Sequence, residues 1–195
     1  MSTITLPTPR RTRSLAWAPR AAAVWAIAYA VGVRGYQGLG GTVGLPGQVE
    51  DPAGLHRASL LAGVFLLLVG LAALSLGRRW TLRLPRALVL VPAVAGSTYA
   101  LGHALTGFIT KPLDLLGVID LEFKGWAHVN ETALALWDIL FYEPWFLGLG
   151  ILVTLASLHH HRLAGGSERG ARRIVAATAL ATLALTVTAI TMILS

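Results

Sequence analysis

The sequence contains no cysteine, and this absence excludes disulfide bonds, thiolate catalysis and metal or cluster sites built on thiolates. Charged residues are scarce as well, since only 13% of the 195 residues are Asp, Glu, Lys or Arg, against 55% that are hydrophobic. So few charges leave little material for a soluble domain. The composition therefore predicts an integral membrane protein.

Lysine is almost absent, because fourteen of the sixteen basic residues are arginine. The net charge of +7 comes from short basic clusters between apolar segments, a pattern typical of membrane orientation. Nucleic acid is therefore not an expected partner, whereas membrane lipids are. The abundance of Arg, Ala, Leu, Gly and Val is typical of a GC-rich bacterial genome, and we expect a multi-pass protein of the bacterial inner membrane.

Several apolar segments are long enough to cross ~30 Å of hydrocarbon at ~1.5 Å per helical residue. We expect an all-α, polytopic transmembrane helical bundle, in which a basic cytoplasmic tail (residues 1–20) precedes a single transmembrane domain (residues 21–195). The spans are predicted at residues 21–39, 58–76, 87–109, 132–158 and 174–194.

The distribution of basic residues predicts the orientation of these spans. Twelve of the sixteen basic residues fall, four each, in the N-terminal tail, in residues 78–86 and in residues 162–173. The segments on the other side carry six of the nine acidic residues. The positive-inside rule then places the N-terminus in the cytoplasm and the C-terminus outside.

Small residues recur at helical spacing on two predicted spans. Gly63, Gly70 and Gly77 lie seven residues apart on one side of the second span, and Thr178, Thr182 and Thr186 form a stripe on the fifth. Such positions let neighbouring helices approach closely. We expect both faces to pack against other helices, and such faces could also support oligomerisation.

The fourth span carries two carboxylates, Asp138 and Glu143, in an apolar segment. A carboxylate at membrane depth costs several kcal/mol unless it is paired, neutralised or hydrated. Both are candidate catalytic groups, and Glu143, the deeper one, is the natural acid. Arg34 and His103 are their expected cationic partners. The predicted binding residues, all in the outer half of the bundle, are Arg34, Tyr99, His103, Asp138, Tyr142 and Glu143.

Helical geometry limits how the two acids can cooperate. Asp138 and Glu143 are five residues apart, which is about 140° around a regular helix, so they do not share a narrow site. Only a kink or break at Pro144 would bring both to one cavity. The sequence leaves open whether the fourth span is continuous or is split at Pro144.

Three functions remain open, and with them the question of whether the protein is an enzyme. The first is a membrane protein that binds a lipid or a small hydrophobic or amphiphilic ligand in the polar pocket. The second is an intramembrane enzyme, such as a cyclase or isomerase of a hydrophobic substrate, with Glu143 as its acid. The third is a structural partner of another membrane protein, in which an Arg34–carboxylate pair only fixes two helices.

We expect structural roles for the consecutive histidines and for the aromatic residues of the fourth span. We expect no cofactor and no metal site, because the adjacent histidines His159, His160 and His161 point in different directions on a helix. They are predicted to be interfacial and solvated. Trp137, Phe141 and Trp145 recur every four residues and are expected to face lipid or to pack.

Two stretches, Trp-Asp-Ile-Leu-Phe-Tyr-Glu-Pro-Trp-Phe-Leu at residues 137–147 and Gly-Leu-Gly-Gly-Thr-Val-Gly-Leu at residues 38–45, are similar to small multi-spanning integral membrane proteins of actinobacteria. That family has no assigned activity, so the resemblance implies a fold and no site residue. A looser similarity, without matching motifs, is to small integral-membrane terpene cyclases, which use carboxylates inside a helical bundle.

Overall fold

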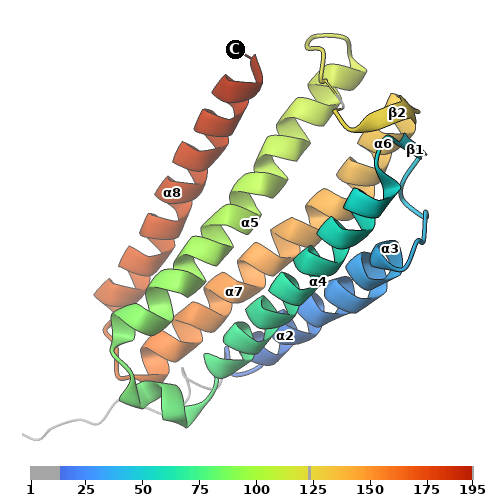
Figure 1. Ribbon diagram of the computed structural model, residues 1–195. Helices are drawn as coiled ribbons and strands as arrows, with labels where there is room; N and C mark the ends of the chain where they lie inside the picture. Colours follow the sequence, from blue (N-terminus) through green and yellow to red (C-terminus); the bar gives the residue numbers. More distant parts are fainter. Residues whose placement is uncertain (1–13, 123, 195) are drawn as a thin grey trace, which may run out of the picture.

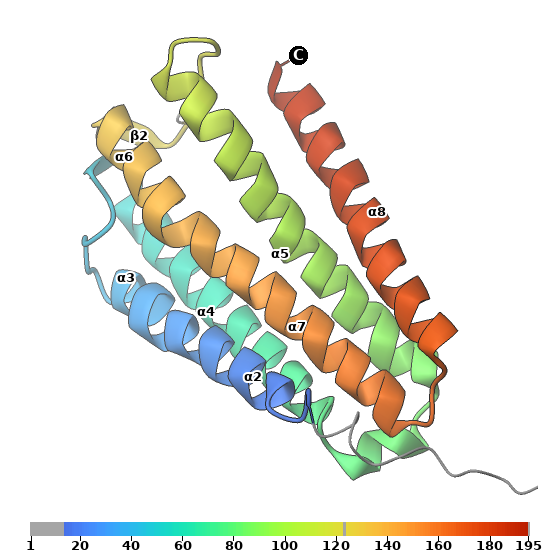
Figure 2. The ribbon, with the colours of Figure 1, turned by 180° about the vertical axis from the view of Figure 1, so that it is seen from behind.

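The computed structural model describes residues 14–122 and 124–194, so residues 1–13 of the predicted cytoplasmic tail lie outside the described part. Within that part, long helices run side by side, as Figures 1 and 2 show from opposite sides. The all-α prediction is confirmed. Four helical segments are long and apolar enough to cross a membrane: Pro52–Ser75, Arg86–Leu115, Glu131–Leu163 and Glu168–Leu194.

The first helical segment runs without interruption through α2 (Ala18–Tyr29), the π-helical segment η1 (Ala30–Gly35) and α3 (Tyr36–Gly38). It confirms a helix at the first predicted span. It is not among the four membrane-crossing candidates, and its last turns carry the polar side chains Arg34 and Gln37.

Helix α4 (Pro52–Ser75) packs on α2 along the predicted glycine seam. A Cβ atom at Gly63 would lie 3.3 Å from the carbonyl oxygen of Ala30, and one at Gly70 would lie 3.3 Å from that of Ala23. Larger residues would therefore force the two backbones apart. The packing role of this seam is confirmed.

The 3₁₀ helix η2 (Arg79–Arg83) connects α4 to α5 (Arg86–Leu115), which continues six residues beyond the predicted end at residue 109. Helix α5 lies between α7 (Glu143–Leu163) and α8 (Glu168–Leu194). The threonine stripe of α8 is buried, as predicted: Thr178, Thr182 and Thr186.

A short antiparallel ribbon was not anticipated from the sequence. Strand β1 (Gly47–Val49) pairs with β2 (Trp126–Val129), and Gly47 lies opposite Val129. A side chain at Gly47 would collide with the backbone of His128, so the pairing requires glycine at this position. The ribbon ties the two long connections together at the end of the bundle that carries most acidic residues (Figure 1).

The fourth span is continuous, which settles the question left open by Pro144. Helix α6 (Glu131–Trp137) begins at Asn130, whose side chain accepts a hydrogen bond from the Ala133 amide at 2.9 Å. The π-helical segment η3 (Asp138–Tyr142) then leads directly into α7. A proline lacks an amide hydrogen and its ring crowds the carbonyl four residues earlier, and the wider π turn before Pro144 relieves that crowding.

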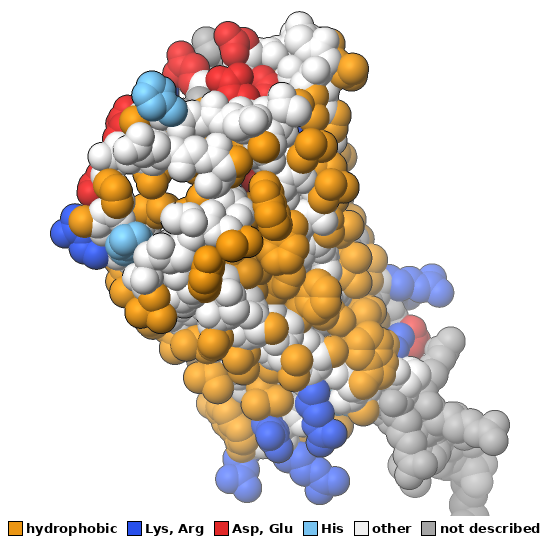
Figure 3. Space-filling model, turned by 90° about the vertical axis from the view of Figure 1, so that its right-hand side faces the viewer, with side chains coloured by type: hydrophobic (Ala, Val, Ile, Leu, Met, Phe, Trp, Pro, Cys, Tyr) orange, Lys and Arg blue, Asp and Glu red, His pale blue; other side chains and the backbone are white. Residues whose placement is uncertain are grey.

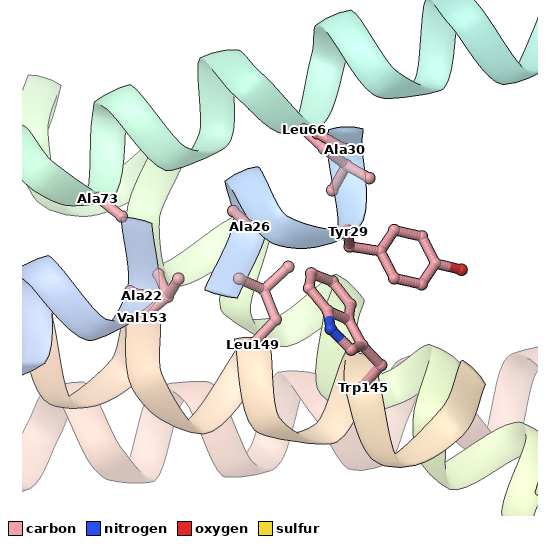
Figure 4. Packing of buried hydrophobic residues seen from close by; sticks show 9 residues of the cluster. All are labelled: Ala22, Ala26, Tyr29, Ala30, Leu66, Ala73, Trp145, Leu149 and Val153. Carbon is pink, nitrogen blue, oxygen red and sulfur yellow. The ribbon is translucent and has the colours of Figure 1, made fainter. Parts of the chain in front are cut away.

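The centre of the bundle is aromatic on one side and built of alanine on the other (Figure 4). The ring of Tyr29 stacks on Trp145 with centroids 4.1 Å apart, and Trp25 Nε1 donates a hydrogen bond of 2.9 Å to the carbonyl of Trp145. Of the predicted aromatic stripe, Trp145 is buried, while Trp137 and Phe141 are more than a third exposed.

The three histidines are buried, so the prediction that they are solvated is wrong. His160 Nδ1 lies 3.2 Å from the carbonyl oxygen of Leu76, and His161 Nε2 lies 3.1 Å from that of Ser167. They therefore fasten the end of α7 to the two loops beside it. Among the described residues, no group of three His, Asp or Glu side chains is placed to hold a metal ion.

Candidate functional site

Each of the two predicted acids of the fourth span has its own nitrogen partner on α5. Asp138 Oδ2 lies 2.9 Å from Lys111 Nζ, and Glu143 Oε2 lies 3.0 Å from His103 Nδ1. His103 was expected as a partner, and Lys111 was not, because the predicted third span ended at residue 109. Since His103, Gly107 and Lys111 follow one another at four-residue spacing, they share one face of α5.

The π turn places both acids on the side of the helix that faces α5. The amide of Glu143 donates to the carbonyl of Asp138, five residues earlier. A π turn brings residues five apart closer to one side of the helix, whereas in a regular helix they are about 140° apart. Both acids therefore face α5 without a break at Pro144, but they do not share one site, because each contacts a different partner.

Glu143 is 3% exposed and sits against a glycine of the neighbouring helix. A Cβ atom at Gly107 would lie 2.0 Å from Glu143 Oε1, so α5 accommodates the carboxylate only because position 107 has no side chain. Its partner His103 stacks on Phe146 with centroids 4.2 Å apart and keeps 39% of its side chain exposed. The pair thus has one buried and one accessible member.

Arg34 takes no part in this arrangement. Its Nη1 donates to Gln37 Oε1 at 3.2 Å, and its guanidinium lies 5.6 Å from the ring centroid of Tyr29. Within residues 14–122 and 124–194, no carboxylate lies within ion-pair distance of it. The expected Arg34–carboxylate pair is therefore absent from the described structure, and α5 supplies the partners of the two acids instead.

Tyr142 belongs with Arg34 and not with the acids. Gln37 Nε2 donates to the Tyr142 hydroxyl at 3.2 Å, and that hydroxyl donates to the carbonyl of Gly44 at 3.2 Å. The chain of hydrogen bonds fixes the glycine-rich loop onto η3. Gln37, which is 1% exposed, was missed by the sequence-based prediction, and its position one turn after Arg34 was the available signal.

A cavity of about 410 Å³ opens beside the His103–Glu143 pair, between α5, α7 and α8. Tyr99 and His103 line it from one face of α5, as their spacing predicted, and Lys111 lies two turns further on. Helix α8 supplies an apolar wall. The ionisable residues that line the cavity are Tyr99, His103, Lys111, Glu122 and Glu143.

The predicted binding residues therefore divide into two groups. Tyr99, His103, Asp138 and Glu143 lie at or next to the cavity, whereas Arg34 and Tyr142 hold the loop at residues 38–45. The first group can donate and accept hydrogen bonds and exchange a proton with a bound molecule through the exposed His103 ring.

No protein-family model, no curated protein and no solved structure matches this chain. The similarity to actinobacterial membrane proteins therefore stays a prediction.

Proposed function

We propose that this chain is an integral membrane protein that crosses a bacterial inner membrane five times and binds a small amphiphile in the cavity between α5, α7 and α8. The distribution of charge supports the orientation. Figure 3 shows most Lys and Arg side chains gathered at one end of the molecule and most Asp and Glu side chains at the other, with a broad hydrophobic surface between them. The basic end is the cytoplasmic end by the positive-inside rule.

The observation that carries the proposal is the half-open His103–Glu143 pair. Glu143 lies about 18 Å along the helix from Glu131 at ~1.5 Å per residue, which is close to the middle of a ~30 Å hydrocarbon layer. A pair that only joined two helices would be covered on both sides. Here His103 is 39% exposed and lines a cavity together with Lys111.

The lining indicates the kind of ligand. Lys111 and His103 donate hydrogen bonds to a polar head group, while Leu185, Ala189 and Ile193 of α8 contact an apolar body. A few placed polar groups in a mainly apolar cavity are typical of small-molecule sites. A molecule with one polar end and one hydrophobic part can contact both the polar side chains of α5 and the apolar residues of α8.

An intramembrane enzyme is the second candidate, and the same pair favours it. An imidazole hydrogen-bonded to a buried carboxylate is a common acid–base arrangement, and the free edge of His103 faces the cavity. In that case Glu143 orients the imidazole of His103 and stabilises its protonated form. The imidazole then gives a proton to a hydrophobic substrate in the cavity or takes one from it.

The experiment is native mass spectrometry of gently solubilised protein, with chromatography of any extracted compound. Wild type is compared with Glu143→Gln and His103→Ala, and with Glu131→Gln as a control that removes one acid at the exposed start of α6. A binding protein loses its compound in the first two variants and keeps it in the control.

The other outcomes separate the alternatives. If Glu143→Gln retains a compound of different mass or retention time from that on wild type, the protein is an enzyme that has stalled on its substrate. If wild type carries no compound, or if both site variants lower only the melting temperature, the cavity proposal is refuted and the pair is structural.

A further inference from the structure

A second hollow lies between α4 and α5, nearer the basic end than the polar cavity. It is an apolar groove of about 810 Å³ whose floor is formed by Phe146, Leu149 and Val153 of α7. Figure 1 shows α7 between the ribbons of α4 and α5 at this place. Only Tyr99 lines both this groove and the polar cavity, among the described residues that line either.

The groove follows from how the helices pair. Helix α4 packs on α2, and α5 packs on α7 and α8, so α4 and α5 contact each other only slightly. The side of α5 that faces the groove also has small side chains in its middle, at Pro92, Ala93 and Gly96. A Cβ atom at Gly96 would have no neighbour within 4 Å. The space is therefore open along the middle of α5.

The dimensions of the groove match one leaflet of a membrane. On α5 it extends from Leu88 to Ala100, which is about 18 Å at ~1.5 Å per residue. Half of a ~30 Å hydrocarbon layer is about 15 Å. It begins at the basic end, where the 3₁₀ helix η2 contributes Trp80, Thr81 and Leu84 to its lining.

The mouth of the groove is strongly basic. Arg78, Arg79 and Arg83 neighbour its lining residues Trp80, Thr81 and Leu84 in the chain; all three are exposed, and none has an ion-pair partner within residues 14–122 and 124–194. Trp80, which is 56% exposed, stands beside them at the depth where tryptophan meets lipid head groups. Arg86 differs from these three, because its Nη2 donates to the carbonyl of Ala164.

We propose that this groove is a binding site for an anionic phospholipid of the leaflet at the basic end. The phosphate is held by Arg79 and Arg83, and one acyl chain lies between α4 and α5 on the floor of α7. Basic pockets between transmembrane helices on the cytoplasmic side recognise anionic head groups in this way. The site is separate from the polar cavity, so its test does not depend on the function proposed for Glu143.

The test is a titration of the detergent-solubilised full chain with phosphatidylglycerol and, separately, with phosphatidylcholine of the same acyl chains, followed by native mass spectrometry. Wild type is expected to retain one phosphatidylglycerol in preference to phosphatidylcholine. Each arginine near the head group contributes about fivefold in affinity, so Arg79→Gln/Arg83→Gln should weaken phosphatidylglycerol binding about 30-fold. The control variant Arg172→Gln/Arg173→Gln removes the same amount of charge at the start of α8 and should leave phosphatidylglycerol binding unchanged.

The acyl chain is tested by filling the groove. Gly96→Leu places a side chain in open space on the groove wall, so the fold is preserved and the lipid is expelled. Gly32→Leu is the matched control, since a Cβ atom there also has no neighbour within 4 Å and residue 32 does not line the groove.

Several results would overturn the proposal. They are equal binding of the two lipids, equal loss in both arginine pairs, or unchanged phosphatidylglycerol binding in Gly96→Leu. If wild type is a dimer and Gly96→Leu makes it monomeric without changing lipid binding, a second copy of the chain occupies the groove instead.

Discussion

The substitution Gly107→Ala tests the geometry of the site with a single methyl group. That methyl would lie 2.0 Å from Glu143 Oε1 and 2.2 Å from its Cδ, whereas heavy atoms need roughly 3.5 Å. The carboxylate therefore has to retreat by about 1.5 Å. Its hydrogen bond to His103, now 3.0 Å long, cannot survive such a displacement.

The expected loss of stability follows from the burial of Glu143, which is 3% exposed. Because His103 is 39% exposed, the loss is that of one hydrogen bond to a buried carboxylate, about 1.5–3 kcal/mol, and replacing glycine by alanine inside a helix returns up to ~1 kcal/mol. We expect a net destabilisation of about 0.5–3 kcal/mol, measured by denaturant unfolding in detergent micelles. Gly96→Ala, on the same helix with open space around it, should instead stabilise by about 0.5–1 kcal/mol.

A double-mutant cycle identifies the cause. In a Glu143→Ala background the collision no longer exists, so Gly107→Ala should become neutral or stabilising, as at position 96. If Gly107→Ala behaves like Gly96→Ala in the wild-type background, the carboxylate does not occupy the described position. If it destabilises equally with and without Glu143, the effect belongs to backbone packing, and the reasoning fails as well.

Three further predictions concern other contacts. Lys111→Met and Asp138→Asn should each destabilise the protein. The double mutant should reveal a coupling energy of about 0.5–3 kcal/mol between the two side chains. Additive effects would show that the ion pair contributes nothing to stability. Gly70→Leu should destabilise the protein by roughly 1–3 kcal/mol because a side chain there meets Ile27 and the backbone of Ala23. An unfolding curve like that of wild type would contradict the close packing of α4 on α2 at this glycine. Because the chain has no cysteine, Arg79→Cys and Asp120→Cys can each be labelled alone. A membrane-impermeant maleimide should reach Asp120→Cys in intact spheroplasts and Arg79→Cys only after lysis, and the reverse pattern would invert the orientation.

The helices could be predicted from the sequence because each depends on a local pattern. Apolar length determined where the long helices lie, and the seven-residue glycine spacing identified the face of α4 that contacts α2. The Asn130 cap could also be predicted, since a side-chain oxygen at this position satisfies a free amide of the first helical turn.

The connections and the site were predicted less well because they depend on contacts between distant segments. Strands β1 and β2 are separated by more than seventy residues and are each three or four residues long, so neither has a recognisable periodicity. Lys111 lies beyond residue 109, the predicted end of the third span. Helix α5 nevertheless continues to Leu115, and this extension carries Lys111 to Asp138.

The π-helical segment η3 shapes the candidate site and was the hardest feature to anticipate. A regular helix would turn Glu143 about 140° away from Asp138, so that only one of the two acids could face α5. The wider turn lets both reach partners on that helix, Lys111 for Asp138 and His103 for Glu143. These two contacts link the fourth span to α5, and the second holds the accessible imidazole at the cavity wall.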